Sequence, residues 1–126
     1  MGLDSHVYSV KLSDVIDDFS FKGSEKTLSL VEFFYWRKNF GIHNAMKRIF
    51  IRKGGDANIN QFNCDYVRLE LSDIEFSKND TDWLDECYSQ NCEETIFMDG
   101  SDREFFCKAE AFLKQNTHAL YFLSWY

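Results

Sequence analysis

The stretch from residue 35 to residue 43 reads Tyr35-Trp36-Arg37-Lys38-Asn39-Phe40-Gly41-Ile42-His43. It lies inside a longer apolar-rich segment, and Ser29-Leu30-Val31-Glu32 ahead of that segment has the capping-box pattern of a helix start. We therefore expect one long central helix that begins near Ser29 and ends near Ile51, before Gly54-Gly55.

A helical projection of this segment, at about 100° per residue, gives three faces. The face expected to meet the core holds Val31, Phe34, Tyr35, Ile42, Ala45 and Ile49, with Lys38 in its middle. A second, aromatic stripe holds Trp36, Phe40, His43 and Lys47. A third, basic stripe holds Arg37, Gly41, Asn44 and Arg48.

Each face leaves two interpretations open. Lys38 either extends its amine to water or to a structural carboxylate, or it is a functional lysine with a lowered pKa. The aromatic stripe packs either on the protein's own chain or on a partner. The gap at Gly41, between two arginines, either admits an anionic ligand or is part of an exposed basic face.

The rest of the chain predicts short strands and helices in mixed order. Strands are expected over residues 6–10, 66–70, 95–98 and 119–126, and short helices over 14–19 and 82–88. A further helix is expected after Ser101-Asp102-Arg103-Glu104, with one apolar face that holds Phe105, Ala109, Phe112 and Leu113. The fold class is therefore α+β. We expect a single domain, residues 1–126, with a small mixed or antiparallel sheet of about four strands on the long helix plus two or three shorter helices.

Composition places the chain among ordinary globular proteins, at 44% hydrophobic and 28% charged residues. No secretory segment opens it, and no apolar run approaches the roughly 20 residues that span a bilayer. We expect a cytoplasmic protein with reduced cysteines. Cys87 and Cys92 form the one close cysteine pair, so the paired spacing of structural zinc sites is missing, and we expect no metal and no cofactor.

The net charge of −7 is unevenly distributed. Residues 1–63 carry nine Lys/Arg against seven Asp/Glu, whereas residues 64–126 carry five against fourteen. The acidic half is either a solvated surface or a face that docks on a basic partner. The candidate partner-binding residues are Asp80, Asp82, Trp83, Asp85, Glu86, Tyr88, Glu93 and Glu94. Direct binding of duplex DNA is disfavoured, because the acidic half would repel phosphates.

Three motifs resemble a family of small uncharacterised proteins of phages, prophages and mobile elements. They are Met1-Gly2-Leu3-Asp4 at the start, Tyr35-Trp36-Arg37-Lys38 with Ile42-His43 in the middle, and Ser124-Trp125 at the end. Asn63-Cys64 with Tyr66-Val67 is also similar to that family's middle strand. The chain departs from the pattern at Phe40, where Ala is more usual, and at Ala45, where an aromatic is common. It also has Ser124 alone where two serines precede the Trp. The resemblance implies an accessory protein that acts on host proteins, and it implies no chemistry.

We therefore expect a protein that works by protein–protein interaction, as an acidic, anti-CRISPR-like inhibitor of a host defence complex or of another nucleic-acid-handling complex with a basic surface. The alternative is a small enzyme or anionic-ligand-binding protein. Its candidate ligand-binding residues are Asp4, Arg37, Lys38, Gly41, His43 and Arg48. Because the motifs lie at both ends and in the middle of the chain, we expect Asp4, Arg37 or Lys38, and the C-terminal strand to meet, with Asp4 neutralising a cation.

Overall fold

The computed structural model describes every residue except 1–2, 24–29, 38–39, 57–61, 80–99 and 126. Within these described residues, four antiparallel strands form one sheet in the order β2-β1-β4-β3. The strands are β1 (Asp4–Lys11), β2 (Val31–Arg37), β3 (Tyr66–Leu69) and β4 (His118–Trp125). The helices of the described residues are α1 (Phe40–Arg52), α3 (Leu71–Asn79) and α5 (Gly100–Lys114), with one 3-10 turn at Leu12–Asp14. The expected α+β class is confirmed.

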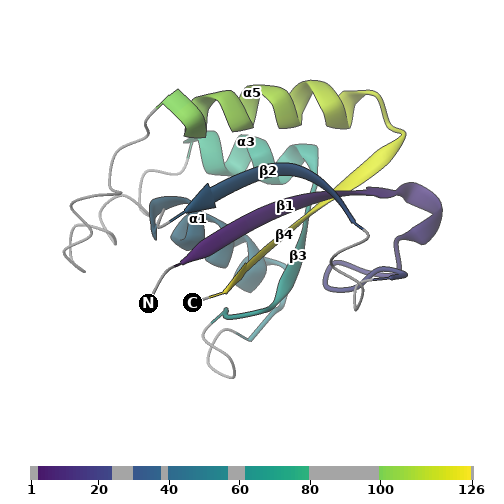
Figure 1. Cartoon of the computed structure of the whole chain (residues 1–126), viewed down its shortest axis with the longest axis horizontal. Helices are drawn as coiled ribbons and strands as arrows, with labels where there is room; N and C mark the ends of the chain where they lie inside the picture. The colour runs from purple at the N-terminus through teal and green to yellow at the C-terminus, as the bar shows by residue number, and fades with distance from the viewer. Residues whose placement is uncertain (1–2, 24–29, 38–39, 57–61, 80–99, 126) are drawn as a thin grey trace.

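The two faces of the sheet differ in what covers them. Side chains alternate along each strand, so Val7 and Phe122 point to one face while His6 and Leu123 point to the other. The first face packs on helices α1, α3 and α5 (Figure 1), and we call it the inner face. The opposite side is the outer face.

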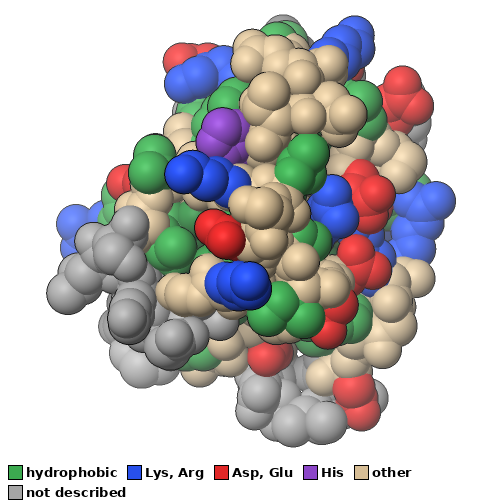
Figure 2. Space-filling model, turned by 90° about the vertical axis from the view of Figure 1, so that its right-hand side faces the viewer, with side chains coloured by type: hydrophobic (Ala, Val, Ile, Leu, Met, Phe, Trp, Pro, Cys, Tyr) green, Lys and Arg blue, Asp and Glu red, His purple; other side chains and the backbone are tan. Residues whose placement is uncertain are grey.

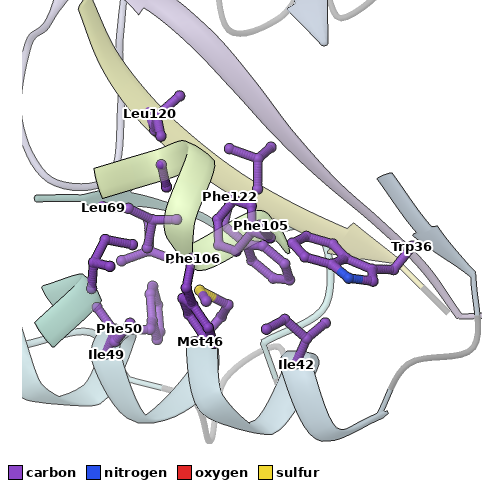
Figure 3. Close-up of a cluster of buried hydrophobic side chains, with 14 of the residues drawn as sticks. Trp36, Ile42, Met46, Ile49, Phe50, Leu69, Phe105, Phe106, Leu120 and Phe122 are labelled. Atoms are coloured by element: carbon purple, nitrogen blue, oxygen red, sulfur yellow. The ribbon is translucent and has the colours of Figure 1, made fainter. Parts of the chain in front are cut away.

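The main core lies between the inner face and the helices (Figure 3). From α1, Ile42, Met46 and Ile49 point into it, at the spacing that places residues on one side of a helix. The Trp36 ring of β2 packs edge-on against Phe105 of α5, with 4.7 Å between the ring centroids. The further buried members of this core are Val7, Phe50, Phe62, Val67, Leu69, Ile74, Phe106, Ala109, Leu120 and Phe122.

Residues 12–22 form an arm that covers part of the outer face. Phe21 of the arm packs on Tyr121 and Tyr66 of the sheet, with centroid distances of 4.5 and 4.9 Å. The Tyr121 hydroxyl donates hydrogen bonds to the backbone carbonyls of Asp17 (2.5 Å) and Ser20 (3.1 Å). The prediction of a short helix over residues 14–19 is wrong. An antiparallel β-bridge between Val15 and Phe21 folds this part of the arm back on itself instead.

The prediction of one long central helix is wrong over the first part of that segment. Residues Val31–Arg37 form strand β2, and the helix begins only at Phe40. The β2 sequence is aromatic and β-branched, and pairing with β1 stabilises such a segment as a strand. Tyr35, expected in the core, is consequently 44% exposed, whereas Trp36 is buried. Lys38 lies outside the described residues.

The other expected elements have mixed outcomes. The strands over residues 6–10, 66–70 and 119–126 are confirmed, to within two residues at each end, as β1, β3 and β4. The helix after residue 101 is confirmed as α5, with Phe105 and Ala109 buried in the core and Phe112 and Leu113 packed against it. The helix over 82–88 and the strand over 95–98 lie outside the described residues. No helix in the described part of the chain has the length and apolar character of a membrane span.

Candidate functional site at the Asp4 end of the sheet

The three motifs of the sequence meet at one end of the sheet, where the two chain termini also lie (Figure 1). Asp4 of β1 stands opposite Arg37 of β2 and opposite Trp125 of β4. In the next row, Ser5 stands between Trp36 and Ser124. The expected meeting of Asp4, Arg37 and the C-terminal strand is therefore confirmed, although strand pairing and not a helix brings Arg37 there.

Asp4 and Tyr35 are joined on the outer face of this end. The Tyr35 hydroxyl donates a hydrogen bond to Oδ1 of Asp4 at 2.7 Å. This bond, followed by desolvation, raises the pKa of Tyr35 above its ordinary value. The Asp4 carboxylate is thus held by a tyrosine hydroxyl, a contact that the expected pairing with a cation did not anticipate.

His6 lies at the centre of an aromatic cluster on the same face. Its ring stacks on Trp125, with 4.6 Å between centroids, and lies 4.8 Å from Tyr35 and 5.7 Å from Tyr8. Nδ1 of His6 forms a hydrogen bond with the Glu32 carboxylate across the β1–β2 pair. Nε2 is buried and has no hydrogen-bond partner. Burial, followed by the charge of Glu32, raises the pKa of Tyr8.

A second polar group lies on the inner face of the same end. Nδ1 of His43, in the first turns of α1, is 2.7 Å from the Ser124 hydroxyl, and both side chains are buried. Burial, followed by the nearby Lys47, lowers the pKa of His43 to about 4, so this imidazole is neutral at pH 7. The Ser5 hydroxyl and the indole N–H of Trp36, in the same row of the sheet as Ser124, are buried without a hydrogen-bond partner.

The buried position decides what the His43–Ser124 pair can do. A serine nucleophile needs a neighbouring base and access to its substrate. Ser124 has a base within hydrogen-bond distance, but its side chain has no exposed surface. The pair therefore holds α1 against β4.

The predicted ligand-binding residues do not form one pocket. Asp4 and Arg37 lie on the outer face, whereas Gly41 and His43 are buried in the first turns of α1, against the inner face. Arg48 is partly buried further along α1. The predicted partner-binding residues between Asp80 and Glu94 lie outside the described residues. Within the described part of the chain, no three His, Cys, Asp or Glu side chains are grouped to hold a metal ion.

Sequence reasoning missed His6, Tyr8 and Glu32 as members of the outer cluster. The alternation of His6 and Tyr8 with Ser5 and Val7 in a strand was the available signal. No comparable signal marks Glu32, because it is 26 residues from its histidine partner.

No protein-family model matches the chain, and no curated protein and no solved structure matches it. The resemblance to a phage protein family therefore stays a prediction.

Proposed function

We propose that the protein acts by binding another protein through the outer face at the Asp4 end of the sheet, as an accessory protein of a phage or mobile element. We call this surface the outer aromatic face. It comprises Asp4, His6, Tyr8, Glu32, Tyr35, Arg37 and Trp125.

The observation that carries the proposal is the exposed Tyr35 ring beside the exposed Arg37. Tyr, Trp and Arg are the residues that most often dominate the binding energy of protein interfaces. The Tyr35 hydroxyl is fixed by Asp4 and the ring packs on His6, so little conformational entropy remains to be lost on binding. The Tyr35 ring is therefore held in a position from which it can contact the surface of another protein.

Charge supports a partner with a basic surface. The chain carries −7, and the outer aromatic face holds two carboxylates, Asp4 and Glu32, against one guanidinium, that of Arg37. At the end of the molecule that carries the arm, acidic and basic side chains are interspersed (Figure 2). The partner class that we propose is a host protein or nucleoprotein, such as a defence complex, which the acidic protein would inhibit by occupying its basic surface.

Affinity capture tests the proposal. The protein should capture a specific partner from cells that naturally carry its gene, and higher ionic strength should weaken the capture. Tyr35→Ala and Arg37→Ala should each weaken it at least fivefold. Ile51→Ala, at an exposed apolar residue of α1, is the matched control and should leave capture unchanged.

Two results would contradict the outer aromatic face as the contact. One is capture that both Tyr35→Ala and Arg37→Ala leave intact. The other is loss of capture on charge reversal at Asp82 and Asp85 with no effect of the Tyr35 and Arg37 variants, which would place the contact on the acidic segment.

A further inference from the structure

The two edges of the sheet differ in how their backbone groups are used. At the β3 edge, the Arg68 N–H donates to the Asp18 carbonyl of the arm at 2.7 Å, and the Lys53 ammonium donates to the Arg68 carbonyl at 2.5 Å. At the other edge, β2 is the last strand of the sheet, and no strand of the described residues pairs with the side of β2 that faces away from β1. The N–H and C=O groups along such an edge can pair with another strand.

The sequence of β2 does not block pairing at this edge. Its seven residues include no Pro and no Lys, which commonly protect exposed strand edges. They are instead mainly aromatic and β-branched, a composition that favours strand pairing.

The outer-face side chains of β2 follow one another as an acid, an aromatic ring and a base, namely Glu32, Tyr35 and Arg37. All three are exposed. The Glu32 carboxylate binds His6 through Oε1, and a carboxylate can accept further hydrogen bonds. Within the described part of the chain, the Arg37 guanidinium has no ion pair and no hydrogen bond.

The register shift makes this charge pattern symmetric about Tyr35. The β1 residues opposite the three side chains are spaced two residues apart: Tyr8, His6 and Asp4. Glu32 and Arg37 therefore lie at equal distances of about 7 Å along the strand on the two sides of Tyr35. The extra residue in the β2 bulge absorbs the difference in sequence separation.

A symmetric pattern of this kind is complementary to itself. A two-fold axis at Tyr35 would pair the β2 strands of two copies in antiparallel orientation. Glu32 of each copy would then stand opposite Arg37 of the other copy, on the same face of the joined sheet. The charges of the edge thus match a second copy of the same edge.

We infer that two copies of the protein associate edge to edge through β2 and form one continuous antiparallel sheet. Backbone N–H and C=O groups of the two edges supply the hydrogen bonds, and two Glu32–Arg37 ion pairs fix the register. These hydrogen bonds lie in the plane of the sheet, so the outer aromatic faces of the two copies come side by side. The inference does not rest on the proposed function, because purified protein alone tests it.

Sedimentation of the purified protein at increasing concentration measures the association. It should show a monomer–dimer equilibrium that higher ionic strength shifts toward the monomer. Glu32→Arg and Arg37→Glu each replace both ion pairs by contacts between like charges, so each should raise the dissociation constant at least about tenfold. Glu104→Arg, at an exposed acid of α5, makes the same charge change as Glu32→Arg and should leave the dissociation constant unchanged.

Mixing the two charge variants separates a contact between copies from a loss of folding. In a mixed dimer, position 32 of one copy and position 37 of the other carry opposite charges at both contacts. An equimolar mixture of Glu32→Arg and Arg37→Glu should therefore dimerise at a concentration at which neither variant does so alone. Mixing would not repair the His6 contact that Glu32→Arg loses within its own copy, so the rescue reports the contact between copies.

Hydrogen exchange locates the contact within the sheet. Amides of β2 should exchange more slowly at high protein concentration than at low concentration, whereas those of β3 should not change. Four results would overturn the inference: a monomer at every concentration up to about 1 mM, equal dissociation constants for Glu32→Arg and Glu104→Arg, a mixture of the two charge variants that stays monomeric, or concentration-dependent protection in β3 and not in β2.

Discussion

Replacing Lys53 by Met should reduce the free energy of unfolding by about 3 kcal/mol. The Lys53 ammonium lies 2.7 Å from Asp73 and 3.1 Å from Glu70, and it donates to the Arg68 carbonyl at 2.5 Å. The Lys53 side chain is 10% exposed and that of Asp73 is 5% exposed, so the variant leaves a buried carboxylate without its cation. Removing one partner of a buried pair costs about 3–5 kcal/mol. We place the cost at the low end, because Glu70 is 48% exposed and water can replace its contact.

Urea unfolding at pH 7, followed by circular dichroism, measures this loss. Lys114→Met is the matched control, because Lys114 is 64% exposed and pairs with Glu110 at 3.3 Å one helical turn away. It should cost less than about 0.5 kcal/mol. In a double-mutant cycle with Asp73→Asn, the coupling energy between positions 53 and 73 should exceed about 1 kcal/mol. The reasoning is refuted if Lys53→Met costs no more than Lys114→Met, or if the coupling energy is zero.

Three further predictions concern other parts of the fold. Tyr121→Phe removes both hydrogen bonds to the arm and should cost about 1–2 kcal/mol, with faster amide exchange across residues 12–22; unchanged exchange would contradict the arm's dependence on this hydroxyl. Gly55→Ala should cost about 1–3 kcal/mol by thermal or urea unfolding, because its Cβ meets the Phe50 ring at 2.5 Å; a neutral variant would show that the ring can move aside. Because the pKa of His43 falls from its ordinary 6.5 to about 4 in the folded state, only the unfolded chain takes up this proton between those pH values. The free energy of unfolding should therefore drop by up to about 3 kcal/mol between pH 7 and pH 4 because of His43. The His43→Gln variant should lack this part of the drop. If the variant and the unmodified protein show the same dependence of unfolding free energy on pH, the prediction is refuted.

The helices and strands that were predicted correctly are those whose residue pattern alone indicates their structure, without contacts from distant parts of the chain. The final strand is apolar along nearly its whole length, and α5 shows helical spacing of Phe105, Ala109 and Phe112. Strand β2 was mistaken for helix because its rings also fit a helical stripe, and a capping-box pattern stands before it. Pairing with β1, which is distant in sequence, decides between the two structures, and no local pattern contains that information.

The candidate site was predictable only in its outline. Motifs at both ends and in the middle indicated that Asp4, Arg37 and the last strand meet. The partner of His6 depends on the register between β1 and β2, which shifts between Val7 and Tyr8. One irregularity of this kind changes which residues face each other across a strand pair, so Glu32 could not be assigned from sequence. A cavity lined by Phe19, Phe50 and Tyr66 draws on three separate chain segments and likewise had no sequence signal.

The row of the sheet that holds Tyr35 and His6 continues through β4 to β3. Tyr66 of β3 pairs with Leu123, which in turn stands opposite His6 in the aromatic cluster. From β2 to β3 the sheet spans three strand spacings, about 14 Å. An extended partner segment of about four residues covers that distance. We propose that an extended partner segment that contacts Tyr35 at the β2 edge crosses the sheet along this row toward Tyr66, so that the recognition surface extends from β2 to β3.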